Sequence, residues 1–197
     1  MRAFVLATAN PHKTEEMAAV LSVLGIDVIA RPGHVGEVEE TEDTLEGNAL
    51  LKARALATAT AQSAVADDTG LFVDALDGRP GVFSARYAGE SATYAQNVEK
   101  LLDEMAALEN RRAHFRTVIA LVSPEGDELV VEGVLDGTIT REPRGENGFG
   151  YDPVFAPDET PGRTLAEISA SEKNGLSHRA RALRALAEKL AEEPRRF

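Results

Sequence analysis

Two adjacent aspartates, Asp67 and Asp68, follow the short apolar run 64–66. Neighbouring carboxylates repel each other, so their proximity requires a cation or a chemical role. Mg²⁺ binds through one or two carboxylates together with substrate phosphates, and this pair could supply such ligands. A carboxylate beside the metal could also orient or deprotonate an attacking water. The pair therefore indicates a metal site that could activate water.

A second acidic group, residues 39–43, precedes a predicted helix that carries Asn48 and Lys52 four residues apart. Residues at this spacing lie on one helix face, where both side chains could meet a ligand. Acids before a helix also complement the positive end of its dipole without any further role. An exposed Asn–Lys pair is equally ordinary. The residues alone leave both interpretations open.

The segment 8–13, Thr-Ala-Asn-Pro-His-Lys, is a predicted strand–turn–helix junction. Free backbone amides at a helix start attract anions, and a nearby lysine would complement a phosphate. Lys13 lies in the first helical turn, where the macrodipole disfavours a cation. The alternative is a surface lysine, with Asn10 as a simple helix cap. The pattern of a P-loop is absent from the sequence.

Three glycines surround two aromatic residues in the segment 145–153. Glycine allows close backbone approach, and the rings of Phe149 and Tyr151 could stack on a base. An ordinary loop that packs its aromatic residues inward would have the same composition. The sequence does not separate these two interpretations.

A second violation of the dipole rule occurs at His178 and Arg179, which follow Ser177, the expected N-cap of a terminal helix. Basic residues in a first helical turn oppose the macrodipole. Together with Lys13, they indicate cations held for an anionic or acceptor-rich ligand in an acidic protein.

Composition limits the classes of function. The chain has 197 residues, of which 43% are hydrophobic, and this is enough for one compact core. Its net charge of −12 argues against a nucleic-acid polymer as partner. No apolar run approaches the roughly 20 residues of a membrane span. With no cysteine there is no thiolate or disulfide chemistry, and no signal-peptide pattern starts the chain, so we expect a cytoplasmic location.

Hydrophobic periodicity predicts the elements that must position these residues. Strands are expected over 2–7, 27–30 and 64–66, with a long hairpin over 116–123 and 128–140. Helices are expected after Asn10, after a capping box of Asp43 and Glu46, and from Ser177. The mixture of βα units with a long hairpin favours an α/β fold with a mixed sheet. Residues 1–197 would form a single domain of two lobes, the hairpin extending into the second lobe.

In their order along the chain, these segments resemble the inosine triphosphate pyrophosphatase family, the non-canonical purine NTP pyrophosphatases. The similar segments are TANPHK, EETEDTLEGNALLKA, ADDTGLFVDALDGRPGVFSARYAG, PRGENGFGYDPVF and SEKNGLSHRARAL, which span residues 8–183. Thr69 stands where many relatives have serine, and Phe83 stands where tyrosine is common.

The resemblance implies an elongated mixed sheet flanked by helices, two lobes with a central cleft, and a homodimer. It implies Mg²⁺-dependent hydrolysis of ITP, dITP or XTP between the α and β phosphates. Asp68 would be the general base, and Glu40 and Asp68 would bind the metal. The residues that it assigns to the purine nucleoside triphosphate are Thr8, Ala9, Asn10, Pro11, His12, Lys13, Asn48, Lys52, Thr69, Phe149, Gly150, Tyr151, Asp152, Lys173, His178 and Arg179.

Two other functions fit the same residues. A non-catalytic nucleotide sensor would bind the ligand without turnover, although a pure sensor needs no paired acids such as Asp67 and Asp68. A related pyrophosphatase could instead prefer modified pyrimidines, which the resemblance of the segment around His178 disfavours.

Overall fold

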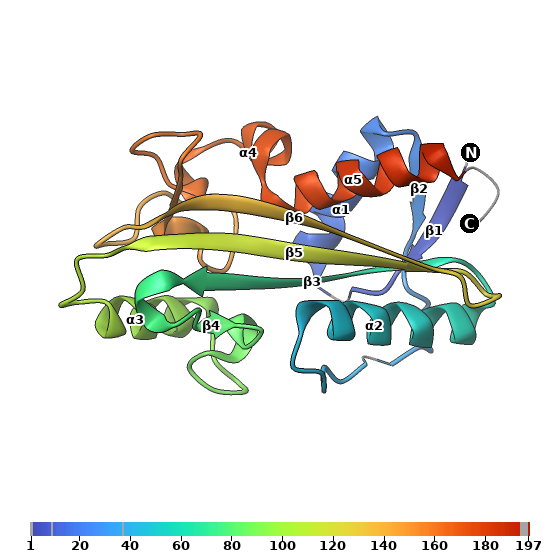
Figure 1. Cartoon of the computed structure of the whole chain (residues 1–197), viewed down its shortest axis with the longest axis horizontal. Helices are drawn as coiled ribbons and strands as arrows, with labels where there is room; N and C mark the ends of the chain where they lie inside the picture. The colour runs from blue at the N-terminus through green and yellow to red at the C-terminus, as the bar shows by residue number, and fades with distance from the viewer. Residues whose placement is uncertain (1, 9, 37, 194–196) are drawn as a thin grey trace. The chain divides into compact units, whose positions relative to one another are not determined.

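The computed structural model describes residues 2–8, 10–36, 38–193 and 197, and it divides into two compact units. Unit 1 comprises residues 1–68, 117–133 and 178–197, and unit 2 comprises residues 69–116 and 134–177. Three long strands contribute residues to both units: β3 (Ala64–Val73), β5 (Arg112–Val122) and β6 (Glu128–Ile139), all labelled in Figure 1. The expected mixed α/β architecture, with a sheet flanked by helices, is confirmed.

Seven strands form the sheet, in the order β2-β1-β3-β5-β6-β7, with β4 paired to β3. The pairs β1–β2 and β1–β3 are parallel, whereas β3–β4 and β6–β7 are antiparallel. The strands are β1 Arg2–Leu6, β2 Ile26–Ile29, β3 Ala64–Val73, β4 Pro80–Gly81, β5 Arg112–Val122, β6 Glu128–Ile139 and β7 Phe155–Pro157.

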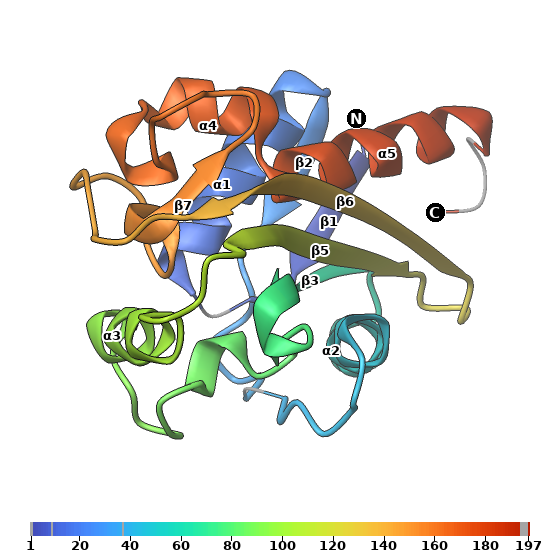
Figure 2. The same ribbon diagram turned by 60° about the vertical axis from the view of Figure 1, so that its left-hand side comes forward.

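Five α-helices and several short 3-10 turns accompany these strands in the described parts of the chain. The helices are α1 Pro11–Val23, α2 Leu45–Thr60, α3 Tyr94–Glu104, α4 Ala170–Leu176 and α5 His178–Glu192. In unit 1, α1 and α5 cover one face of the strands and α2 covers the other (Figures 1 and 2). In unit 2, α3 and α4 lie on opposite faces (Figure 2).

Each unit has its own hydrophobic core. In unit 1, Phe4 and Leu6 of β1 pack with Met17 and Leu21 of α1 and with Leu183 of α5. In unit 2, the core contains side chains from β3, α3, β5 and β6, among them Leu71, Leu101, Phe115, Leu135 and Ile139. Apolar residues three or four apart on a helix share one face, and these faces supply the helical side chains of each core.

The start of α2 differs from the prediction. Thr44, not Asp43, is the N-cap, and its hydroxyl accepts a hydrogen bond of 3.0 Å from the backbone amide of Gly47. The capping box of Asp43 and Glu46 is therefore wrong by one residue. Threonine and aspartate are both good caps, so adjacent candidates leave the register ambiguous in the sequence.

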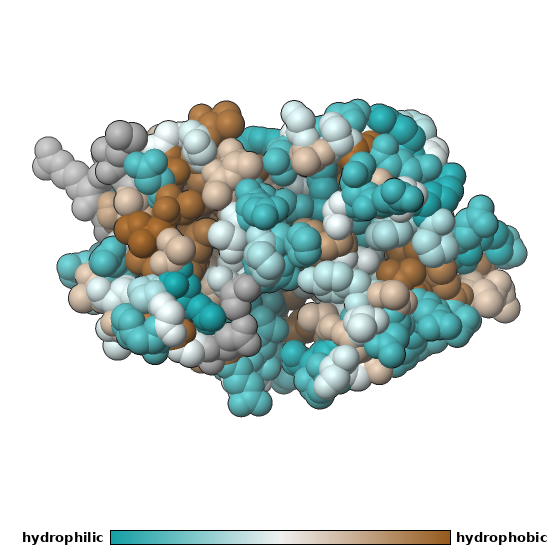
Figure 3. Space-filling view, turned by 180° about the vertical axis from the view of Figure 1, so that it is seen from behind, coloured by the Kyte–Doolittle hydropathy of each residue, from teal (hydrophilic) through white to brown (hydrophobic). Residues whose placement is uncertain are grey.

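The surface is mainly hydrophilic on the face shown in Figure 3, where hydrophobic atoms gather in separate groups. Large exposed hydrophobic residues include Val23 and Phe83. Within the described ranges, no helix combines the length and apolar character that crossing a bilayer demands.

Candidate functional site

The aspartate pair lies inside a strand and not at its end. β3 continues from Ala64 to Val73, and Asp67 and Asp68 are only 2% and 4% exposed. The predicted strand end after Ala66 is therefore wrong. Aspartate and glycine are poor strand formers. The sequence also gives no sign that the charges of Asp67 and Asp68 are compensated by other side chains within the fold.

Asp68 is held by two residues of α2 and lies close to the acidic segment before that helix. The Lys52 ammonium lies 3.1 Å from Asp68 Oδ1 and 2.6 Å from Glu40 Oε1, so it bridges the two carboxylates. The Asn48 amide, fully buried, donates to Asp68 Oδ2 at 3.4 Å. The interpretation of Asn48 and Lys52 as an exposed surface pair is wrong.

Asp67 is held by cations from both ends of the chain. Lys13 Nζ of α1 lies 3.2 Å from Asp67 Oδ2. Arg179, at the start of α5 and 2% exposed, donates to the same oxygen from Nε at 3.2 Å and from Nη2 at 3.1 Å. A third guanidinium nitrogen, Nη1, donates to Glu16. Two of the basic residues that oppose a helix dipole are thus paired with a buried acid.

The start of α1 is capped by its own side chain. Asn10 Oδ1 accepts hydrogen bonds from the amides of His12 at 3.0 Å and Lys13 at 3.4 Å, and Pro11 occupies the first turn. Thr8 Oγ1 accepts a hydrogen bond of 3.1 Å from the backbone N–H of Asn10. The backbone amides of His12 and Lys13 therefore donate to Asn10, and the prediction that the amides of this helix start are free is wrong for these two residues. For Asn10, the alternative of a simple helix cap is correct. Ala9 lies outside the described residues.

We call Glu16, Glu40, Asp67 and Asp68, with Lys13, Lys52 and Arg179, the carboxylate cluster. Four acids face three bases, so the cluster carries a net charge of −1 when every group is ionised. Excess buried charge is unfavourable, so we expect at least one acid of the cluster to have a raised pKa.

The acid with the raised pKa is Asp68. Burial, assisted by the charge of Glu40, raises the pKa of Asp68 to about 6 against the opposing effect of Lys52. Burial also acts on Asp67, but there the charges of Lys13 and Arg179 prevail and hold its pKa well below the usual range. Lys52 in turn has a raised pKa, because Asp68 and Glu40 outweigh its burial. Two adjacent carboxylates are therefore given different proton affinities.

The donors of the carboxylate cluster fit Mg²⁺, which prefers carboxylate oxygens. Glu40 and Asp68 both face one cation, the Lys52 ammonium, and burial, with a smaller contribution from Glu40, raises the pKa of Asp68. Among the described side chains, no group of three or more His, Cys, Asp or Glu residues could hold a metal ion.

A second cluster lies in unit 2, around the glycine-rich segment, and we call it the loop pair. Lys173 Nζ of α4 lies 2.5 Å from Asp152 Oδ2, and both side chains are buried. The same Asp152 oxygen accepts from the Phe149 amide at 2.8 Å. Gly148, at φ +75°, passes so close that a Cβ would overlap the Asp152 carboxylate. The Asp152 carboxylate thus fixes the conformation of the loop.

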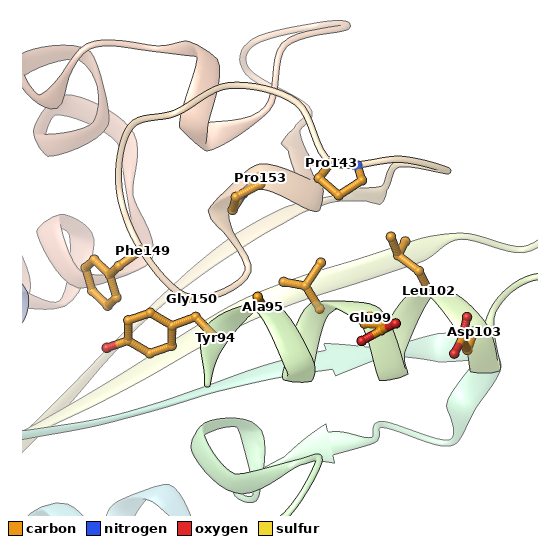
Figure 4. Close-up of a pocket in the computed structure, with 10 residues that line it drawn as sticks. Tyr94, Ala95, Glu99, Leu102, Asp103, Pro143, Phe149, Gly150 and Pro153 are labelled. Atoms are coloured by element: carbon orange, nitrogen blue, oxygen red, sulfur yellow. The ribbon is translucent and has the colours of Figure 1, made fainter. Parts of the chain in front are cut away.

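Phe149 presents its ring at the edge of an apolar pocket of about 480 Å³. Lys173 Nζ lies 4.6 Å from the ring centroid, and the Tyr94 ring of α3 lies 6.0 Å away at a tilt of 43°. Figure 4 shows Phe149 and Tyr94 at one end of the pocket, beside Gly150. A lysine near an aromatic face is a favourable cation–π arrangement.

The other members of the predicted base-binding group have different surroundings. Tyr151 packs into the core of unit 2, 5% exposed, and its hydroxyl donates to the Ser84 carbonyl at 2.9 Å. For this ring the inward-packing alternative is correct. Thr69 is half-buried on β3 as the first residue of unit 2. His178 is the first residue of α5 and is buried, with Nδ1 2.6 Å from Thr117 Oγ1.

The structure thus brings about half of the predicted residues into two networks, one described in each unit. Sequence reasoning missed Glu16, which completes the contacts of Arg179, and Thr117, which contacts His178. Glu16 lies three residues after Lys13 and so shares its helix face, a signal that was available. Thr117 gave no signal, because a threonine in a strand is ordinary.

Comparison with known proteins places these networks in context. The sequence model described as the Ham1 family matches residues 4–189. A protein of Thermoanaerobacter sp. (strain X514) named dITP/XTP pyrophosphatase is 51% identical over 183 residues, 91% of each chain. A Bacillus subtilis (strain 168) protein of the same name is 45% identical, covering 96% of this chain and 98% of its own. The structure of a HAM1 protein from Coxiella burnetii is 44% identical, with a TM-score of 0.87, and covers 98% of this chain and 100% of its own.

Proposed function

The chain belongs to the Ham1 family, and from this premise we propose that it hydrolyses non-canonical purine nucleoside triphosphates, such as ITP, dITP and XTP. The products are the monophosphate and pyrophosphate, so the enzyme removes these nucleotides from the precursor pool. Relatives named dITP/XTP pyrophosphatase, 45–51% identical over most of the chain, support this substrate class. The observation that carries the chemistry is the buried pair Asp67 and Asp68, whose proton affinities differ.

Asp68 is the proposed general base. A carboxylate with a pKa of about 6 is mostly ionised at neutral pH and still accepts a proton readily, which suits it to this role. Water attacks the α phosphorus, the bond to the α–β bridging oxygen breaks, and pyrophosphate leaves. The proton of the water passes to Asp68 Oδ1 or Oδ2, whose orientation Lys52 and Asn48 fix.

Mg²⁺, held by Glu40 and Asp68, would neutralise phosphate charge and polarise the scissile bond when bound. Lys13 and Lys52 supply the positive charge that the triphosphate requires from the protein. Both lysines are already oriented by acids, so binding needs little further ordering of their side chains. Thr8, Asn10, Pro11 and His12 belong to the same end of α1 and are proposed to hold the triphosphate with Lys13.

Phe149, Gly150, Asp152 and Lys173 are proposed as base-binding residues within unit 2. His178 and Arg179 are proposed as base-binding residues within unit 1, on the resemblance to the family. Phe149 offers a ring face, and the loop pair below it keeps that ring in place. A 6-oxo purine carries an acceptor where adenine carries an amino donor, so donors at this position select ITP over ATP. Arg179 donates to Asp67 and Glu16, and both His178 and Arg179 are proposed as donors to the base.

The decisive experiment incubates the purified protein with Mg²⁺ and a panel of ITP, dITP, XTP, GTP, ATP and dUTP, with phosphate and pyrophosphate detected separately. We expect pyrophosphate release from the first three at catalytic enzyme concentration. Binding of ITP without turnover would show a sensor, and a preference for the pyrimidine nucleotide would show a different pyrophosphatase. Chelation of Mg²⁺ should stop the reaction.

We also propose a homodimer in the cytoplasm, both on the resemblance to the family. Light scattering is expected to give twice the chain mass of 21.1 kDa. A particle of 21.1 kDa at the assay concentration would contradict the dimer.

A further inference from the structure

Ser84 is a buried polar residue of unit 2 that the proposed reaction does not use. It begins the 3-10 turn Ser84–Arg86 and is 7% exposed. Its hydroxyl accepts a hydrogen bond of 2.8 Å from the backbone N–H of Leu71 in β3, and it donates one of 2.6 Å to the carbonyl of Gly81 in β4. Both roles are unambiguous, because a backbone N–H only donates and a carbonyl only accepts. Ser84 is therefore fixed to two strands.

The segment that follows Ser84 is fixed to α3 by Asn97. The side chain of Asn97, 2% exposed, accepts a hydrogen bond of 2.8 Å from the backbone N–H of Ala88. Its amide nitrogen donates to the Ala85 carbonyl at 3.0 Å. Breaking a buried hydrogen bond leaves an unsatisfied polar group, which is unfavourable. The segment from Ser84 to Ala88 therefore has one preferred position, set by β3, β4 and α3.

Tyr151 is bonded to this fixed segment. The hydroxyl of Tyr151 donates a hydrogen bond of 2.9 Å to the Ser84 carbonyl, and the ring is 5% exposed. Burial raises the pKa of Tyr151, so its hydroxyl stays protonated and remains a donor at neutral pH. The position of Tyr151 is thus set by Ser84 and, through Ser84, by the strands and helix around it.

A tight turn joins Tyr151 to Phe149. The Asp152 backbone N–H donates to the Phe149 carbonyl at 3.2 Å, and the Phe149 N–H donates to the Asp152 carboxylate at 2.8 Å. Gly150 has φ +63°, a conformation that glycine adopts without steric cost. Because the first and last residues of the turn 149–152 are bonded to each other, the position of Tyr151 determines where the Phe149 backbone lies.

From this geometry we propose that Tyr151 is a positioning residue, whose hydroxyl on the Ser84 carbonyl holds the turn that carries Phe149 and so sets the affinity for the purine base. The proposal rests on the proposed function, which gives the Phe149 ring the role of stacking on that base. Tyr151 acts without contacting the nucleotide, because its ring belongs to the core of unit 2. Ordering the turn before binding lowers the entropy cost of binding.

The test compares a ligand that carries a base with one that does not. IMP carries hypoxanthine, whereas pyrophosphate has no base for the Phe149 ring to contact. Calorimetry in the same Mg²⁺ buffer gives the Kd of each ligand for the wild-type protein and for Tyr151→Phe, which keeps the ring and removes the hydroxyl. We expect the Kd of IMP to rise roughly 10-fold, the effect of losing one ordinary hydrogen bond, and the Kd of pyrophosphate to stay unchanged.

Kinetics with ITP give a second measurement. In Tyr151→Phe the KM should rise by the same factor as the Kd of IMP while kcat changes little, because a loss of binding shared by the ground state and the transition state alters KM alone. Tyr87→Phe is the matched control, since it removes a hydroxyl of the same unit that bonds to Glu104 and not to the turn. It should leave KM and both Kd values unchanged.

Ser84→Ala tests the other partner of the bond. This variant keeps the carbonyl that Tyr151 uses but releases its segment from β3 and β4. It should weaken the binding of IMP and spare that of pyrophosphate, as Tyr151→Phe does. The double variant should lose less than the product of the two single factors, because both substitutions act through one contact.

An unchanged Kd of IMP in Tyr151→Phe would overturn the proposal. An equal loss of affinity for IMP and pyrophosphate would also overturn it, because a general structural defect affects both ligands. A wild-type protein that binds IMP but releases no pyrophosphate from ITP would refute the proposed reaction alone, and the binding comparison would still decide the role of Tyr151. A wild-type protein that binds no nucleotide would overturn both.

Discussion

The carboxylate cluster of unit 1 and the loop pair of unit 2 both bury charge, but they balance it differently. In the loop pair one acid, Asp152, faces one base, Lys173, at 2.5 Å, and the Phe149 amide satisfies the same oxygen. In the carboxylate cluster four acids face three bases, and the pKa of Asp68 rises to about 6.

This difference separates a structural use of charge from a chemical one. A balanced pair fixes a loop and gains nothing from a further cation. A cluster with excess negative charge lowers the free energy of unfolding, and binding of a proton or a metal ion would reduce this effect. Strongly perturbed carboxylates of this kind occur preferentially at functional sites. The comparison therefore supports the proposal that the carboxylate cluster of unit 1 carries the chemistry, while the loop pair of unit 2 positions an aromatic ring.

The largest effect is expected from Asp68→Asn. Loss of a general base lowers kcat by roughly 10²–10⁴-fold, and loss of metal positioning adds to this. Retention of more than about a tenth of wild-type kcat would contradict the role of Asp68, because it lies far outside that range. The exposed residue Asp43 provides the control, since Asp43→Asn makes the same chemical change and should leave kcat unaltered.

The same variant should be more stable than the wild type without metal. The pKa of folded Asp68, about 6, lies above its ordinary value of 3.8, so protonation favours the folded state. That contribution is complete below about pH 4 and is lost as the pH rises through about 6. Asparagine removes the penalty, which is on the order of 2 kcal/mol at pH 7.5. Melting in EDTA should show this gain at pH 7.5, and the gain should shrink towards pH 4.

Breaking the loop pair is expected to lower the stability of the protein, in addition to its effect on base recognition, to which Asp152 and Lys173 are assigned. Removing one partner of a buried ion pair costs about 3–5 kcal/mol, so Asp152→Asn and Lys173→Met should each destabilise the protein strongly. The double variant should lose less than the sum, with a coupling energy of about 1–3 kcal/mol in denaturant unfolding. Additive losses would show that Asp152 and Lys173 do not act as a pair.

Arg112 and Asp158 serve as the matched exposed pair of unit 2, with the guanidinium 2.8 Å from the carboxylate. Both side chains are about half exposed, so the corresponding cycle with Arg112→Met and Asp158→Asn should give less than about 1 kcal/mol.

The smallest effect is expected from Lys13→Ala. Loss of one charge-assisted contact to the triphosphate, about 1.5–3 kcal/mol, corresponds to roughly a 10–100-fold fall in kcat/KM for ITP. Stability should fall by less than the roughly 3–5 kcal/mol of a fully broken pair, because Arg179 still holds Asp67. Lys189→Ala, which removes an exposed lysine paired with Glu192, should change neither quantity measurably. A lower melting temperature with unchanged kinetics would make Lys13 purely structural.

Local patterns in the sequence predicted helices α1, α2 and α5, whereas α3 and α4 were not predicted. Asn10 followed by Pro11 predicted the start of α1, and the apolar spacing of α5 predicted its buried face. The dipole violations at Lys13 and Arg179 indicated cations held for a ligand, and in the structure both residues contact Asp67 of the protein itself. These signals are local, since caps and periodicity depend on residues a few positions apart.

Partners distant in the chain could not be predicted in the same way. Glu16 and Arg179 are 163 residues apart, and only the packing of α1 against α5 brings them together. The length of β3 also escaped prediction, because its charged residues are tolerated through lysine and arginine side chains from other elements. Such compensation depends on tertiary structure, which overrides strand propensity.

Asn48 has a consequence for the segment that carries Glu40. Its Oδ1 accepts from the Glu42 amide at 3.0 Å, and its Nδ2 donates back to the Glu42 carbonyl at 3.2 Å. The Glu42 amide thus has a fixed partner although it belongs to no helix or strand. In deuterium oxide this hydrogen should exchange slowly, at the rate at which the first turn of α2 opens, while neighbouring loop hydrogens exchange quickly. Slow exchange of the Glu42 amide would show that the segment carrying Glu40 is ordered before a nucleotide binds.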